Sequence, residues 1–162
     1  MDDLFAPPGT EWVRLSPKLR TLRRVLLLAL MGPFAVAGVV LLAAFTSPWL
    51  AVLGALACLA AGAWWWVVIG RAWRAWGYAE RDEDLVVTHG VLIRRLTVVP
   101  YGRMQFVDVT AGPLDRRFGI ATVQLHTASA ATDATIPGLT PDEAARLRDR
   151  LSAVGQARSA GL

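Results

Sequence analysis

The stretch 63-AWWWVVIGRAWRAWGYAERDEDLVVTHG-90 changes its character within a few residues. It begins with three consecutive tryptophans in an apolar run and ends in acids, strand-forming residues and a His-Gly pair. Indole rings favour the headgroup zone of a membrane, where the ring meets acyl chains and the N–H meets water. The stretch therefore predicts the point at which a membrane span ends and a small cytoplasmic β domain begins.

The residues before this point form a long uncharged run. No Asp, Glu, Lys or Arg occurs from Val25 to Gly70, and apolar residues make up 54% of the 162-residue chain. The run predicts two spans, residues 25–45 and 49–70, each long enough at 1.5 Å per residue to cross a hydrocarbon core of about 30 Å. Only "TSP" separates them, which predicts a tight antiparallel hairpin. The length of the run and the second span disfavour a cleaved signal peptide, and the missing polar faces disfavour a buried pair of soluble helices.

Basic residues flank the two spans on one side of the membrane. Arg71 and Arg74 follow the second span, and the connection between the spans has no basic residue. Because basic residues stay on the cytoplasmic side, both termini and the β domain are expected at the inner face of a bacterial plasma membrane. Residues 1–24 are then a basic juxtamembrane segment, whose cations are Arg14, Lys18, Arg20, Arg23 and Arg24.

Aromatic, basic and small residues suggest roles within the membrane part. Gly54, Cys58 and Gly62 recur every four residues, a spacing that lets helices approach closely, either within the hairpin or against another membrane protein. An aromatic ligand cage is the alternative to a belt of interface anchors. The expected anchors are Arg23, Arg24, Trp49, Trp64, Trp65, Trp66, Arg71, Trp73 and Arg74.

Beyond the spans, the periodicity becomes that of strands. Residues 84–100 predict two strands with a turn at His89-Gly90, and residues 104–111 predict a third. Residues 120–127 alternate apolar and polar, and residues 131–138 predict a short edge strand that Pro137 closes. The octapeptide 112–119 reads as a turn or a single helical turn.

The clearest local signal is a helix over residues 139–154. Thr140 as N-cap, Pro141 at N1 and Glu143 at N3 form a capping box. An apolar stripe predicts burial of one face, and the arginines off that stripe predict a solvated face. The predicted fold class is thus α+β: a transmembrane hairpin, then a domain over residues 77–155 with five or six antiparallel strands and a covering C-terminal helix. Residues 156–162 are expected to be a flexible tail.

Three motifs in fixed order carry a family resemblance. They are GVLIRRLTVVPYGRMQFVDV (90–109), GPLDRRFGIATVQLHTA (112–128) and IPGLTPDEAARLRDRL (136–151), preceded by two spans and a basic stretch. Together they resemble the bacterial membrane-anchored pleckstrin-homology-like proteins of the YdbS-like type. The resemblance implies a bent antiparallel sheet capped by a C-terminal helix and implies little about function.

Motifs for catalysis and cofactor binding are missing from the sequence. It contains no P-loop, GxGxxG, HExxH or CxxC, and its two histidines lie in unrelated places. An acidic cluster at residues 80–84 fits no EF-hand loop and predicts a solvated turn rather than a metal site. The expectation is a protein that is not an enzyme and holds no cofactor or metal.

Two binding functions remain, and they differ in partner. The favoured one is a scaffold or accessory module that contacts another membrane protein, or a copy of itself, at the inner face. The alternative is a sensor of anionic lipid headgroups; an enzyme or transporter would need residues from a partner chain. Nucleic acid is not expected, because the net charge of +4 belongs mainly to the membrane flank. The residues expected to contact headgroups or a partner are Arg94, Arg95, Arg103, Arg116 and Arg117.

Overall fold

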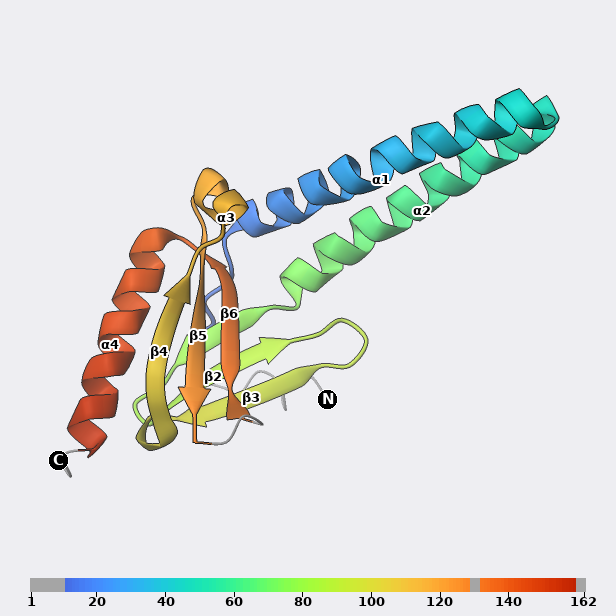
Figure 1. Ribbon diagram of the computed structural model, residues 1–162. Helices are drawn as coiled ribbons and strands as arrows, with labels where there is room; N and C mark the ends of the chain where they lie inside the picture. Colours follow the sequence, from blue (N-terminus) through green and yellow to red (C-terminus); the bar gives the residue numbers. More distant parts are fainter. Residues whose placement is uncertain (1–10, 129–131, 160–162) are drawn as a thin grey trace. The chain divides into compact units, whose positions relative to one another are not determined.

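The computed structural model describes residues 11–128 and 132–159 and divides the chain into two compact units. One unit is the helical stretch Arg20–Arg71, and the other joins the residues up to Leu19 with those from Ala72 onward. Figure 1 gives the element labels used below.

Two long apolar helices make up nearly all of the helical unit. They are α1 (Pro17–Phe45) and α2 (Pro48–Arg74), with mean hydropathies of 2.6 and 2.0 over their most apolar windows. Both are long and apolar enough to cross a membrane. Each helix extends beyond the predicted span, so Trp73 and Arg74 lie inside α2 rather than after it. The helices are separated by Thr46 and Ser47, within the predicted connection 46–48, and Pro48 is the first residue of α2.

The second unit contains two antiparallel sheets of three strands each. The first has the order β1 (Gly77–Glu80), β2 (Asp84–His89) and β3 (Arg95–Pro100). The turn η2 (Tyr101–Arg103) leads into the second sheet, with β4 (Met104–Thr110), β5 (Ala121–Thr127) and β6 (Ala134–Leu139). The short helix α3 (Pro113–Phe118) connects β4 to β5, and α4 (Pro141–Ser159) follows β6 (Figure 1). The prediction of five or six antiparallel strands and a closing helix is confirmed, with six strands in the described residues.

Period-two burial explains how β5 fixes the core of this domain. Its pattern alternates strictly, so Ala121, Val123 and Leu125 point inward as predicted. By contrast Leu85, Val86 and Val87 are all buried, which shows that β2 is covered on both faces.

Three boundaries differ from the prediction. The β2–β3 connection is a loop of residues 90–94 instead of a two-residue turn at His89-Gly90. β6 continues through Pro137 to Leu139, which Pro tolerates because β6 is an edge strand. α4 runs to Ser159, so residues 156–159 are helical, and the rest of the predicted tail (160–162) lies outside the described residues.

The segment 11–19, which includes the first residues of α1, belongs to the domain, although the sequence suggested only a basic flank. Val13 forms an antiparallel bridge with Tyr78, through backbone N···O distances of 2.8 and 3.1 Å. Leu15 and Leu19 are 2% and 5% exposed. Residues 11–19 therefore contribute to the core and to the edge of β1.

Candidate functional site

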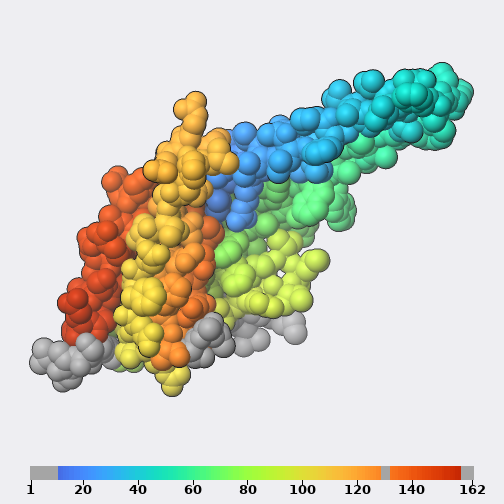
Figure 2. Space-filling model, in the orientation of Figure 1, coloured from blue at the N-terminus to red at the C-terminus, as the bar shows by residue number. Residues whose placement is uncertain are grey.

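A groove lies between the edge strand β4 and the last helix. β4 occupies one end of its sheet, and α4 runs beside it, as Figures 1 and 2 both show. The groove has a volume of about 370 Å³. Its lining residues come from these two elements only: Met104, Gln105, Phe106, Val107, Leu151, Ser152, Gly155 and Gln156.

The start of α4 is fixed by the predicted capping box, which the structure confirms. The Glu143 backbone N–H donates to Thr140 Oγ1 (3.3 Å), and the Thr140 N–H donates to the Glu143 carboxylate (3.0 Å). Leu147 and Leu151 are 0% and 1% exposed, so the apolar stripe is buried as expected. The cap and the stripe together hold the helix wall of the groove in place.

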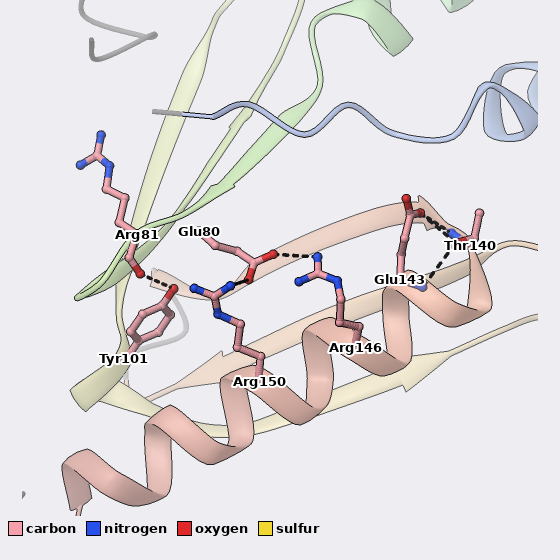
Figure 3. A network of polar contacts seen from close by, with 7 residues as sticks. All are labelled: Glu80, Arg81, Tyr101, Thr140, Glu143, Arg146 and Arg150. Carbon is pink, nitrogen blue, oxygen red and sulfur yellow. Dashed lines mark hydrogen bonds and ion pairs between the residues drawn. The ribbon is translucent and has the colours of Figure 1, made fainter. Parts of the chain in front are cut away.

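A charged clamp ties the same helix to the first sheet (Figure 3). Glu80 Oε1 lies 2.9 Å from Arg146 Nη2, and Glu80 Oε2 lies 3.1 Å from Arg150 Nη1. The Glu80 side chain is 9% exposed, and hydrogen bonding to it raises the pKa of Arg146. The prediction of a solvated acidic turn is therefore wrong for Glu80, and the arginine face of α4 is not simply solvated. The i, i+4 spacing of the two arginines was the available signal, but nothing local marked Glu80 as their partner.

Two tyrosines beside this clamp are buried. The Tyr101 hydroxyl donates to the Arg81 carbonyl at 2.9 Å (Figure 3), which connects η2 to the end of β1. Burial raises the pKa of both Tyr78 and Tyr101. Both phenols therefore stay neutral at physiological pH.

An aromatic and polar cluster borders the groove at Phe106. Its ring stacks on His126 with a centroid distance of 4.4 Å, and His126 Nδ1 lies 3.2 Å from Asp133 Oδ2. The hydrogen bond from the Thr127 backbone N–H, together with His126, lowers the pKa of Asp133. The ring of His126, on the polar face of β5, therefore supports the exposed Phe106.

The five arginines expected to contact headgroups or a partner fall at three places in the domain. Arg94 and Arg95 lie at the β2–β3 hairpin, and Arg103 lies in η2 before β4. Arg116 and Arg117 lie in α3, after the opposite end of β4. A seven-residue strand spans about 23 Å, so Arg103 and the α3 pair do not form one rim.

The expected interface anchors lie along the two helices. Trp49, Trp64 and Trp65 are 78%, 72% and 52% exposed, as suits rings that face lipid. Arg24 sits over the Trp66 ring at 4.1 Å in a cation–π contact. Trp73 is tied down, because its Nε1–H donates to the Ser16 carbonyl at 3.1 Å. Arg23, Arg71 and Arg74 lie on the same helices.

The expected small-residue seam makes a close approach only at Gly54. A Cβ there would lie 2.7 Å from the Leu42 side chain, whereas one on Gly62 would meet nothing within 4 Å. Cys58 and Gly62 instead line a gap of about 270 Å³ between α1 and α2. The three residues therefore do not act as one continuous contact within the hairpin.

His89 occupies the end of β2 rather than a turn. Its ring stacks on Trp76 with a centroid distance of 4.8 Å. Burial lowers the pKa of His89, and the charge of Arg95 lowers it further. The folded domain therefore favours the neutral imidazole.

We expect acidification to destabilise the domain through His89. The pKa of His89 in the folded state lies below its ordinary value of 6.5, so the unfolded chain binds the proton more strongly. The free energy of unfolding therefore decreases as the pH falls below 6.5. Thermal unfolding of the chain in detergent between about pH 7.5 and 5.5 should show a smaller decrease of Tm for His89→Gln than for the native protein. Equal decreases would contradict the assignment.

The described residues offer no cluster for a metal. Within residues 11–128 and 132–159, no group of three or more His, Cys, Asp or Glu side chains is placed to hold an ion. The absence of a cofactor and of catalysis remains a prediction from the sequence motifs.

Comparison with known proteins agrees with this architecture. The model of the bacterial PH domain family matches residues 25–154, which include most of α1, all of α2, the six strands described above and most of α4. The chain belongs to the bacterial PH domain family. This bacterial PH domain protein is also similar to the UPF0699 transmembrane protein YdbS of Bacillus subtilis (strain 168), with 37% identity over 79 residues. The match covers 49% of this chain and 48% of the relative, so the chain spans about half the length of that protein. No solved structure gives a significant match.

Membership explains the two candidate spans. The family match begins in the first apolar helix, and the relative is described as a transmembrane protein. This bacterial PH domain protein is therefore membrane-associated. Its PH-like domain is continuous in the chain with the start of α1 and with the end of α2.

Proposed function

We propose that this protein is a membrane-anchored binding module that receives an extended segment of another membrane protein in the β4–α4 groove. It would act as an accessory or assembly subunit at the inner face of the plasma membrane. The observation that supports this function best is the edge strand β4 beside a groove walled by α4.

An edge strand is suited to this role because its outer backbone groups can pair with another strand. No other strand in the described parts of the chain pairs with this edge of β4. An added strand would form main-chain hydrogen bonds with β4, while its alternate side chains would enter the groove. The groove offers apolar surface from Met104, Phe106 and Val107 and uncharged polar groups from Gln105 and Ser152. An uncharged segment with both polar and apolar side chains fits this lining.

Anchoring makes a weak contact sufficient. Only two residues, Ala75 and Trp76, separate the end of α2 from the start of β1. The domain would stay near the membrane surface, where a membrane-bound partner is confined to the same layer. We propose that both helices span the membrane and that the basic flanks keep both termini cytoplasmic.

Site-specific crosslinking from the groove tests the proposal. A photoreactive amino acid at the exposed Gln105 should crosslink one discrete membrane protein in native membranes, whereas the same group at the exposed Thr135 of β6 should not. Ser152→Trp places a large ring in the groove and should reduce the yield of the adduct at least about tenfold, because the ring would occupy the space of the bound segment.

Ala153→Trp is the matched control. Ala153 is the next residue on α4 and is also exposed, but it does not line the groove. The adduct should persist in this variant. Equal adducts in the two tryptophan variants, or equal adducts from Gln105 and Thr135, would contradict a partner in the groove.

A further inference from the structure

The loop between β2 and β3 exposes three consecutive apolar side chains. Val91, Leu92 and Ile93 are 37%, 98% and 73% exposed, and we refer to them as the apolar tip. Arg94 and Arg95 follow directly and are also exposed. Single exposed apolar residues are common on proteins, but a contiguous exposed group at the end of a hairpin indicates a surface that is covered in use.

The tip is held in a defined shape. His89 pairs with Arg95 as the last pair of the β2–β3 ladder, so both ends of the loop are held by paired strand residues. Gly90 has φ +107°, and a Cβ on it would lie 2.0 Å from the Ile93 carbonyl oxygen. Only glycine permits this close approach, which fixes the path of the loop that presents Leu92 and Ile93.

The hairpin carries opposite charges at its two ends. Asp84 pairs with Pro100 at one end, next to the acids Asp82 and Glu83, and Arg81 lies 3.8 Å from Asp84, so this end keeps an excess of negative charge. The apolar tip with its two arginines lies at the other end, a strand length of about 20 Å away. A negatively charged surface would therefore attract the tip and repel the acidic end.

We propose that the apolar tip inserts into the boundary between headgroups and acyl chains of the membrane that anchors the chain, with Arg94 and Arg95 at lipid phosphates. Adjacent apolar and basic residues are the composition of segments that lie in this zone. The domain begins two residues after α2, so the bilayer surface is always at high local concentration. This contact is with lipid rather than protein, and it does not depend on the proposed partner in the β4–α4 groove.

Fluorescence quenching with the full chain in nanodiscs tests the insertion. Cys58→Ala removes the native thiol, and Leu92→Cys then carries an environment-sensitive dye. Ala153→Cys, on the exposed face of α4, carries the same dye as the control. In nanodiscs that contain anionic lipid and shallow nitroxide-labelled lipid, the dye at position 92 should be quenched at least about twofold more than the dye at position 153.

The outcomes separate lipid from protein as the covering partner. Blue-shifted emission at position 92 without nitroxide quenching would mean that protein covers the tip and would overturn the proposal. Equal quenching at positions 92 and 153 would also overturn it. Arg94→Gln with Arg95→Gln should reduce the quenching in anionic nanodiscs, and unchanged quenching would remove the role of the two arginines.

Discussion

Replacement of Gly138 by alanine should lower the free energy of unfolding by about 3 kcal/mol, which combines a backbone cost with an overpacking cost. Gly138 has φ +72°, a region that disfavours any residue with a Cβ. The added Cβ would lie 2.6 Å from the Cβ of Leu19, an atom next to the backbone that cannot swing away. Because the Gly138 carbonyl also accepts the Ser16 N–H at 3.1 Å, the substitution should loosen the N-terminal segment from the domain.

Thermal unfolding of the full chain in detergent measures this effect. The tryptophan fluorescence transition should shift down by more than about 10 °C for Gly138→Ala. Gly102→Ala is the matched control, because a Cβ at Gly102 would meet nothing within 4 Å and its φ is not positive. Equal shifts for the two variants would contradict the packing of Leu19 on β6.

Glu80→Ala should destabilise the domain by about 2 kcal/mol, the range for hydrogen bonds between charged groups. The substitution removes the carboxylate that forms both ion pairs of the clamp, at 2.9 Å from Arg146 and 3.1 Å from Arg150. The cost stays below that of a fully buried pair because both arginines are 51% exposed and remain hydrated after the loss.

Urea unfolding of the full chain in detergent measures how much Glu80 contributes to the free energy of unfolding. Asp108→Ala removes an exposed acid of β4 and should change the stability by less than about 0.5 kcal/mol. Combining Glu80→Ala with Arg146→Ala should cost clearly less than the sum of the single changes, since the two residues share one contact. Additive costs would show that Glu80 acts without the clamp.

Local patterns predicted most of the elements correctly. The two apolar helices, strand β4 and the start of α4 follow from runs, alternation and capping residues that lie next to one another in the chain. The cap at Thr140 shows why: its partner Glu143 is three residues away, and the hydrogen bonds match the motif.

Contacts between distant residues were the part that the sequence could not predict. Glu80 and Arg146 are 66 positions apart, so the acid looked like part of a solvated turn. Val13 bridges to Tyr78, and Leu19 packs on Gly138, yet the residues before α1 read only as a basic flank. Such pairings depend on how the sheets and helices pack together, which no short window of sequence contains.

The candidate sites show the same limit. The arginines expected to contact headgroups or a partner were chosen by residue type, and the structure places Arg103 and the two arginines of α3 at opposite ends of β4. The apolar tip is visible in the sequence as VLI. Because these residues were assigned to a predicted strand after a turn at His89-Gly90, the exposure of Leu92 was not predicted. The β4–α4 groove needed two elements from different parts of the chain.

Cysteine accessibility tests the central claim, which is that α1 and α2 span the membrane and hold the PH-like domain on the cytoplasmic side. In the Cys58→Ala background, Ser47→Cys reports on the connection between the helices and Ala153→Cys reports on the domain. A membrane-impermeant maleimide should label position 47 in intact cells and position 153 only in inside-out vesicles. Labelling of position 153 in intact cells, or protection of position 47 there, would contradict the account.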